Sequence, residues 1–141
     1  MNLLKQEQQL QFDHFKHSDA LQFGLNILKI VEQEKLKNVR IRVRYENDLV
    51  FQYLMNDKNG EMWLDRKEKT VLESGHSSLY VYENQELYPD MIDNNNYAVC
   101  GGGFPLIEQG KIKGVFCVSG LEHDQDHRLI IDSLKEVLNH G

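Results

Sequence analysis

The chain has few residues that break or cross-link a polypeptide, since its 141 residues include only two prolines and two cysteines. It also lacks the roughly 18 consecutive apolar residues that a membrane-spanning helix requires. The N-terminal sequence MNLLKQEQQLQ becomes polar after Leu4, which is too early for the apolar region of a secretory signal peptide. These absences favour a cytoplasmic protein without a membrane partner.

An excess of basic residues is missing as well. The chain contains 16 Lys and Arg against 22 Asp and Glu, for a net charge of −6. Proteins that bind nucleic acids or anionic membranes depend mainly on clustered Lys and Arg, so we expect no nucleic-acid partner. The length suits a single domain over residues 1–141. Cys100 and Cys117 lie in apolar, strand-like runs, which favours reduced packing residues over a disulfide.

The sequence also lacks the short motifs of common catalytic and cofactor sites. It contains no G-x-x-x-x-G-K-[ST] phosphate loop, no G-x-S-x-G nucleophile elbow, no H-E-x-x-H zinc motif and no C-x-x-C or C-x-x-C-H. His123 and His127 have the spacing of two ligands to one metal, with Asp124 and Asp126 beside them, but acids are also common in the first turn of a helix. The sequence therefore assigns no metal and no catalytic residue, and it leaves open whether the protein is an enzyme.

Hydrophobic periodicity predicts several helices. Apolar residues three or four apart indicate a short opening helix and a longer one that is capped by Ser18 and ends near Leu36. The same spacing predicts helices over residues 60–74, just after His76, and over residues 124–138.

Alternating apolar residues predict two β-hairpins. In 39-VRIRVRY-45 the apolar side chains point one way and the arginines the other, and an Asn-Asp turn leads to a partner strand over residues 49–55. A second pair of strands, over residues 97–107 and 111–119, flanks Gly110. Because hairpins produce antiparallel sheets rather than doubly wound parallel ones, the predicted fold class is α+β.

Two segments rich in small residues are candidates for a binding site. The glycine triplet in 100-CGGGFP-105 could form a bend or bulge in the strand, or it could expose backbone N–H groups to an anion or a flat ligand. In 74-SGHSS-78 the serines could cap the following helix, while the histidine could contact an anionic group.

Two rows of cationic side chains are further candidates. The arginines of 39-VRIRVRY-45 could be solvated, could pair with acids on a neighbouring element, or could bind an anion or a partner subunit. On the predicted helix over residues 60–74, Trp63, Arg66 and Lys67 share nearly one face. That face could pack against the core with its charged ends in water, or it could contact a ligand.

The order of these motifs resembles a known family. QE…L-x-F-x-x-F, W-x-x-R-K-x-x-T-V…G-H-S-S and G-G-G-F-P…V-S-G-L…D-H follow one another from Gln6 to the final helix. They are similar to the haem-degrading-domain superfamily, which includes GlcG-like and HbpS-like proteins, and most similar to a branch with bacterial and fungal members. The resemblance implies a profilin-like or PAS-like core with a five-stranded antiparallel sheet between helices, assembled as a homo-oligomer.

The same resemblance implies haem as a candidate cofactor, because some members of the superfamily bind it. The chain has no C-x-x-C-H attachment motif, and the surroundings of its six histidines single out no axial ligand. We therefore favour a non-catalytic, homo-oligomeric domain that binds a small anionic or planar ligand. Haem binding or degradation, a protein-interaction or assembly module without a ligand, and a metal-dependent hydrolase with His123 and His127 are the alternatives. The expected ligand-binding residues are Trp63, Arg66, Lys67, His76, Ser77, Ser78, Gly101, Gly102, Gly103, Asp126 and His127.

Overall fold

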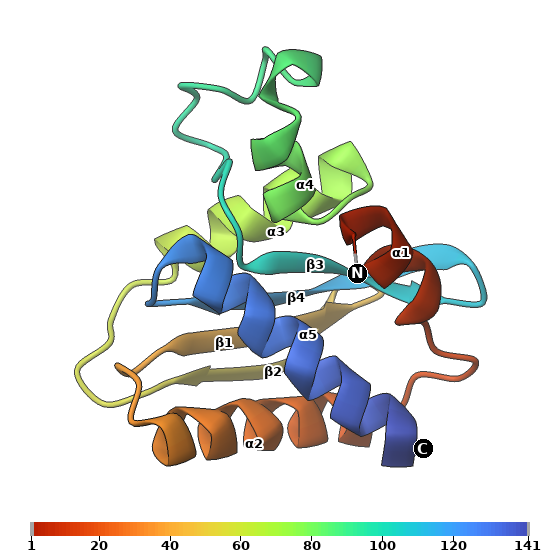
Figure 1. Cartoon of the computed structure of the whole chain (residues 1–141), viewed down its shortest axis with the longest axis vertical. Coiled ribbons are helices and arrows are strands. Elements are labelled where there is room, and N and C mark those ends of the chain that lie inside the picture. Colours follow the sequence, from red (N-terminus) through yellow and green to blue (C-terminus); the bar gives the residue numbers. More distant parts are fainter. Residues whose placement is uncertain (1, 141) are drawn as a thin grey trace.

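Two β-hairpins join into one antiparallel sheet at the centre of the molecule (Figure 1). The computed structural model describes residues 2–140. Its strands are β1 (Arg40–Tyr45), β2 (Asp48–Leu54), β3 (Gly103–Glu108) and β4 (Lys111–Ser119). Their order across the sheet is β2-β1-β4-β3, so the hairpins meet through the antiparallel pairing of β1 with β4.

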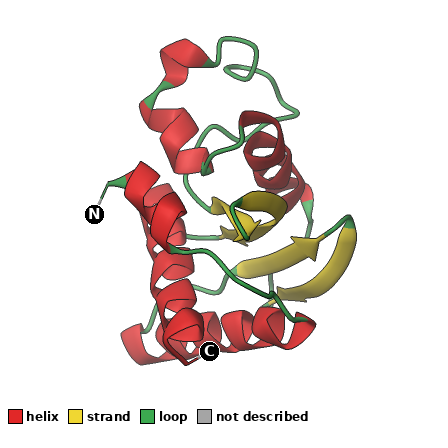
Figure 2. Cartoon of the chain, turned by 90° about the vertical axis from the view of Figure 1, so that its right-hand side faces the viewer, coloured by secondary structure: helices red, strands yellow, loops and turns green. Residues whose placement is uncertain are grey.

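Helices cover both faces of this sheet (Figure 2). They are α1 (Leu3–Gln9), α2 (His17–Glu34), α3 (Met62–Ser74), α4 (Ser78–Glu83), the 3-10 helix η1 (Gln85–Leu87) and α5 (His123–His140). Helices α2 and α5 pack against one face and α3 against the other, while α4, η1 and the chain that follows them project beyond the sheet (Figure 1). Layers of helix, sheet and helix confirm the predicted α+β class. Within residues 2–140, no helix combines the length and the apolar character that crossing a membrane would need.

The sheet has four strands, and the prediction of five is wrong. At the outer edge of β3, Phe12 makes an isolated parallel bridge with Glu108. The Phe12 N–H donates to the Ile107 carbonyl at 2.8 Å, and the Phe12 carbonyl accepts from the Gln109 N–H at 2.9 Å. This bridge occupies the position of a fifth strand, but it stops after one residue because the chain turns away to begin α2.

The strand that was predicted over residues 97–107 begins only at Gly103. The Gly102 carbonyl still accepts from the Val118 N–H of β4 at 2.8 Å, but the residues before it bond to helices. The Ala98 N–H donates to Thr70 Oγ1 at 3.0 Å, and the Gly101 N–H donates to His123 Nδ1 at 3.0 Å. Cys100 therefore lies outside the sheet, and both cysteines of the chain are free, as the sequence predicted.

The start of α2 also differs from the prediction, which placed its cap at Ser18. The helix begins at His17, and the backbone N–H of Lys16 donates to the carboxylate of Asp19 at 2.9 Å. An acid in the first turn thus closes this helix end. The cap of α4 agrees with the prediction, since Ser77 supplies it. The remaining helix ends agree within two residues, which is the usual uncertainty of a helix boundary.

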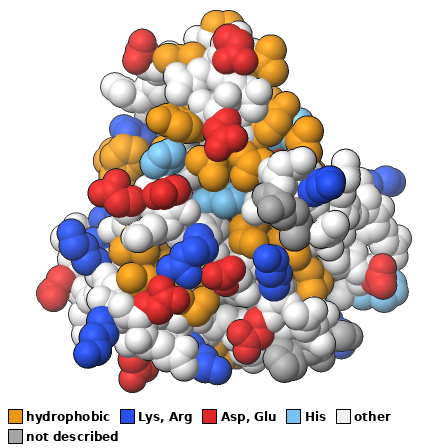
Figure 3. All heavy atoms as spheres, in the orientation of Figure 1, with side chains coloured by type: hydrophobic (Ala, Val, Ile, Leu, Met, Phe, Trp, Pro, Cys, Tyr) orange, Lys and Arg blue, Asp and Glu red, His pale blue; other side chains and the backbone are white. Residues whose placement is uncertain are grey.

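The main core lies between the sheet and the pair α2 and α5. It contains side chains from β1, β3 and β4 together with both helices. A smaller cluster on the opposite face joins α3 to β4, through Leu64, Val71, Val115 and Cys117. On the face shown in Figure 3, acidic and basic side chains alternate in the lower half, and hydrophobic side chains gather above them.

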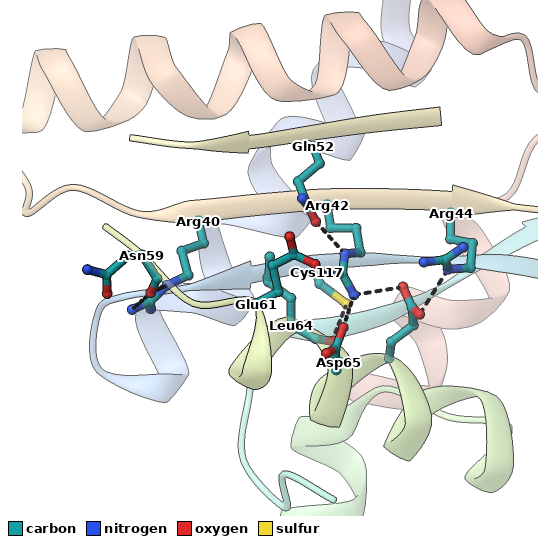
Figure 4. Close-up of polar contacts among 10 residues, drawn as sticks. Arg40, Arg42, Arg44, Gln52, Asn59, Glu61, Leu64, Asp65 and Cys117 are labelled. Carbon is teal, nitrogen blue, oxygen red and sulfur yellow. Dashed lines mark hydrogen bonds and ion pairs between the residues drawn. The ribbon is translucent and has the colours of Figure 1, made fainter. Parts of the chain in front are cut away.

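Arginines of β1 hold α3 onto the sheet (Figure 4). Arg42 is 2% exposed; its Nε donates to Gln52 Oε1 at 2.7 Å, and its terminal nitrogens lie 2.6 Å from Asp65 and 3.1 Å from Glu61. Arg44 Nε donates to Glu68 at 2.9 Å. Of the options for this row, pairing with acids of a neighbouring element is confirmed for Arg42 and Arg44.

We expect the Arg42→Ala substitution to lower the free energy of unfolding by about 3 kcal/mol. It removes a large buried side chain, and it weakens the compensation of Glu68, which is 13% exposed and lies 3.6 Å from Arg42. The matched control is Arg128→Ala, since Arg128 is 39% exposed and pairs with two surface acids, Glu34 and Asp132. Exposed pairs contribute about 0–1 kcal/mol. Urea denaturation measures both variants, and equal losses would contradict the role assigned to Arg42.

Candidate functional site

A buried ion pair between Lys67 of α3 and Asp126 of α5 forms the centre of the candidate site. Lys67 Nζ lies 3.1 Å from Asp126 Oδ2, and the two side chains are 3% and 2% exposed. The same Nζ donates to the Val118 carbonyl of β4 at 2.8 Å. Burial raises the pKa of Asp126, while Lys67 and the N–H of Leu121 act in the opposite direction. The pair therefore connects α3, β4 and α5.

A cleft of about 350 Å³ opens beside this ion pair, and we call it the Lys67–Asp126 cleft. Small-ligand pockets usually measure about 300–1,000 Å³, so the cleft could take a small molecule or part of a larger one. Besides Lys67 and Asp126, its lining includes Trp63 of α3, Arg40 of β1 and Lys58 of the loop between β2 and α3.

Cationic donors predominate in the cleft. Arg40 uses three of its N–H groups, donating twice to the Asn59 carbonyl at 3.0 and 3.2 Å and once to Ser119 Oγ at 3.4 Å. A guanidinium has five N–H groups and an ammonium has three, so Arg40 and Lys67 each retain donors beyond the contacts described above. Asp126 is the acid in the lining, and Lys67 offsets its charge.

His123 and Cys100 also line the cleft. The Gly101 N–H donates to His123 Nδ1 at 3.0 Å, so the ring proton of a neutral His123 lies on Nε2, which can donate to a ligand. Tyr82 packs against the His123 ring with 4.6 Å between centroids. Burial raises the pKa of the Cys100 thiol, which is therefore neutral at pH 7.

The glycine triplet forms a bend behind the cleft, where helices approach its bare backbone. A Cβ on Gly101 would overlap the His123 carbonyl, and a Cβ on Gly102 would overlap both Lys67 Nζ and the Val118 carbonyl. Gly102 has a φ of +119°, which side chains rarely adopt. The triplet thus allows the buried lysine to reach its two acceptors.

The 74-SGHSS-78 segment lies against α1 and β3 instead of lining the cleft. The Ser77 hydroxyl caps α4, and Ser78 Oγ accepts from the Gly103 N–H at 2.9 Å. His76 Nδ1 lies 2.9 Å from Glu7 Oε1 of α1. All three side chains are therefore engaged within the fold.

Arg66 and His127 do not line the cleft either. The Arg66 guanidinium lies 5.1 Å from the centroid of the Trp63 ring. His127 Nε2 lies 2.8 Å from Gln6 Oε1 of α1, so His127 and His123 contact separate partners. Of the residues expected from the sequence, Trp63, Lys67 and Asp126 line the cleft, and the glycine triplet lies behind it.

Sequence reasoning missed seven residues of the lining, namely Arg40, Lys58, Cys100, Ser119, Gly120, Leu121 and His123. Arg40 had a signal, because anion binding was one option for the arginine row. His123 had been considered only as a metal ligand. Lys58 had none, since a single lysine in a loop has no periodicity, and the fold alone brings it beside the others.

Comparison with known proteins assigns the family. The model of the haem-degrading protein HbpS-like family matches residues 15–135, and the chain belongs to this family. A UPF0303 protein of Psychromonas ingrahamii is 34% identical over 97% of this chain and 91% of the relative. A UPF0303 protein of Pseudomonas entomophila is 35% identical over 98% of this chain and 81% of the relative.

Solved structures share the fold. The crystal structure of Ybr137w protein matches with a TM-score of 0.87 and 25% identity, over 99% of this chain and 87% of that one. HbpS matches with a TM-score of 0.73 and 17% identity, over 91% of this chain and 92% of that one. A complex of PduOC with heme matches with a TM-score of 0.71 and 15% identity, over 86% and 93%. At the lower identities the likeness concerns the fold alone.

The close packing of Lys67 on Gly102 predicts that Gly102→Ala lowers the free energy of unfolding by about 4 kcal/mol, from backbone strain and overpacking together. Gly110→Ala is the matched control, because Gly110 also has a positive φ, of +78°, but no atom lies within 4 Å of its added Cβ. Strain alone should then lower stability by about 1–2 kcal/mol. Urea denaturation measures both variants, and an equal loss would show that Gly102 has no packing role.

Proposed function

We propose that this domain binds a small, planar, anionic ligand in the Lys67–Asp126 cleft. The observation that carries the proposal is the convergence of three cationic side chains in one cleft of a chain whose net charge is −6. Arg40, Lys58 and Lys67 come from three separate elements, and the lining offers a single acid to oppose them. A concentration of positive charge in a concave site attracts anions.

The arrangement of donors suits a carboxylate. A carboxylate accepts hydrogen bonds through two oxygens, and bonds to charged donors are stronger than those between neutral groups. Unused N–H groups of Arg40 and Lys67 and the Nε2–H of His123 supply donors of both kinds. The anionic part of the ligand is therefore expected beside Arg40, Lys67 and His123.

Trp63 supplies the surface for the planar part of the ligand. Its side chain is 40% exposed, and it lines the cleft. Aromatic faces bind flat apolar groups by offset stacking. An acid on a flat, partly apolar framework combines both features.

Haem is the second candidate, because the chain belongs to a haem-degrading family and a structural neighbour is a heme complex. A porphyrin with two carboxylates satisfies the planar and anionic requirements. The described cleft residues do not fit iron ligation, however. His123 has its proton on Nε2, whereas a ligating histidine presents a lone pair there and donates from its other nitrogen.

The two candidates differ in their dependence on iron. We expect protoporphyrin IX, which has no metal, to bind with a Kd within about threefold of that of hemin. Iron ligation would instead make the binding free energy of hemin more favourable by several kcal/mol, and the two Kd values would then differ much more. Titration is followed by absorbance and by quenching of the single tryptophan, which is Trp63. Arg40→Ala with Lys58→Ala should weaken both ligands about tenfold or more, because each loses a charged donor.

Two further variants complete the test. His14→Ala removes an exposed histidine outside the cleft and should leave both affinities unchanged. Hemin that binds tightly while protoporphyrin does not, with the difference abolished by His123→Ala, would favour iron ligation over the proposal. Two results would contradict the proposed site for this ligand class. One is that neither porphyrin binds saturably, and the other is that the doubly substituted protein binds both porphyrins as tightly as the wild-type protein does.

We also propose that the domain is non-catalytic and forms a homo-oligomer. Exposed leucines of α2, Leu21 and Leu25, and exposed residues of the outer strand β2, Leu49 and Tyr53, support assembly, because all four are 43–51% exposed. Native mass spectrometry of protein purified from its source should show more than one subunit together with a bound small molecule. A monomer at micromolar concentration would contradict the assembly without affecting the ligand proposal.

A further inference from the structure

Helix α1 is attached to the rest of the fold through a buried carboxylate. The Glu7 residue is 8% exposed. Its Oε1 lies 2.9 Å from His76 Nδ1, and its Oε2 accepts from the Ser77 N–H at 3.0 Å. Because an ionised carboxylate only accepts, His76 Nδ1 carries the proton in this contact. Both oxygens of Glu7 therefore have donors from one turn of the chain, 69 and 70 residues away in sequence.

The residue before Glu7 makes a second polar contact with the body of the domain. Gln6 Oε1 lies 2.8 Å from Nε2 of His127, which is 4% exposed. Burial lowers the pKa of His127 to about 4, so the ring is neutral and Nε2 donates to the amide oxygen. The other nitrogen, Nδ1, is buried and has no partner among the described residues. Consecutive side chains of α1 thus cover two imidazoles.

Apolar packing adds little to this attachment. The helix has seven residues, which is too short for a stable helix in isolation. Leu4 is 43% exposed, and the buried residue within the helix is Glu7 itself. Leu10, just after its last residue, is buried in the core and fixes the chain there.

We propose that His76, Ser77 and His127 form a carboxylate-binding site, which α1 fills with Glu7 and Gln6, and that a free carboxylate can replace Glu7 there. In this arrangement α1 is an internal occupant of the site and is held by contacts that a ligand can reproduce. The site differs from the Lys67–Asp126 cleft, whose lining contains none of these residues. Displacement of α1 removes the contact of Gln6 with His127 and frees Nε2 of that ring.

The glycine triplet connects this second site to the cleft. Gly103 donates its N–H to Ser78, which follows Ser77, and a Cβ on Gly101 would lie 3.3 Å from the Cβ of His127. Gly101 also holds His123 of the cleft through its N–H. One bend of the backbone therefore contacts residues of both sites.

Chemical rescue tests the proposal with acetate as the probe. Glu7→Ala removes a methylene and a carboxylate, which are the atoms of acetate. In this variant we expect the exchange of α1 amide hydrogens to accelerate about tenfold or more, since two bonds to a carboxylate are lost. Addition of sodium acetate should then shift the Ser77 amide resonance saturably in a two-dimensional NMR spectrum.

Gln8→Ala is the matched control, because Gln8 is an exposed residue of the same helix. It should change neither the exchange of α1 nor the Ser77 resonance, and sodium chloride at equal ionic strength should not replace acetate. A Ser77 resonance that does not respond to acetate in Glu7→Ala would overturn the proposed site. Exchange of α1 that is equal in Glu7→Ala and in the wild-type protein would overturn the role of Glu7.

A second variant covers the case in which Glu7→Ala does not fold. Glu7→Gln keeps the size of the side chain but removes its charge. Both contacts then become bonds between neutral groups, and the His76 ring must move its proton to Nε2 before Nδ1 can accept from the NH2 group. Amide exchange in α1 should again accelerate about tenfold, and exchange at the wild-type rate would overturn the proposal. Porphyrin binding by the cleft is expected to be unchanged in both variants, which separates this site from the first.

Discussion

The burial of one ammonium group constrains the centre of this fold. Lys67 reaches Asp126 and the Val118 carbonyl across the glycine bend, and all of these groups are shielded from water. An uncompensated charge at this depth would be strongly unfavourable, so α3, β4 and α5 must keep their relative positions for both acceptors to remain in reach. The requirement for a residue without a side chain at Gly102 follows from the same contact.

That constraint also determines what the neighbouring cleft can bind. The first turn of α5 carries Asp126 inward, and it places His123 beside the bend, where the Gly101 N–H fixes the imidazole tautomer. Arg40 enters from β1 because alternate residues of this strand face α3 rather than the main core. The positive character of the cleft is thus a consequence of sheet register and helix packing, and the ligand charge that it favours follows from it.

The sequence was sufficient for most of the elements, because hydrophobic periods of two and of three to four report local geometry. It did not fix the buried face of α2, where Leu21 and Leu25 belong to the apolar period but are exposed, while Phe23 and Ile27 are buried. It could not supply the contacts that decide function. Lys67 and Asp126 are 59 residues apart, and His76 and Glu7 are 69 apart. A histidine next to two serines indicated a ligand contact, and the structure shows an acid of α1 in that position. The strand before Gly103 was overpredicted, since Ala98 and Gly101 donate to side chains of helices α3 and α5 rather than to a neighbouring strand.

Family membership and local chemistry answer different questions about this domain. The match over residues 15–135 assigns the fold and its family, but a shared fold accommodates different ligands when the side chains around its clefts differ. The decisive atom here is Nε2 of His123. Because the bend donates to Nδ1, this nitrogen is a hydrogen-bond donor in the neutral ring, and in the proposed site it suits an oxygen rather than a metal. The proposed recognition of a carboxylate therefore depends on the backbone of the glycine triplet, whichever planar framework carries that carboxylate.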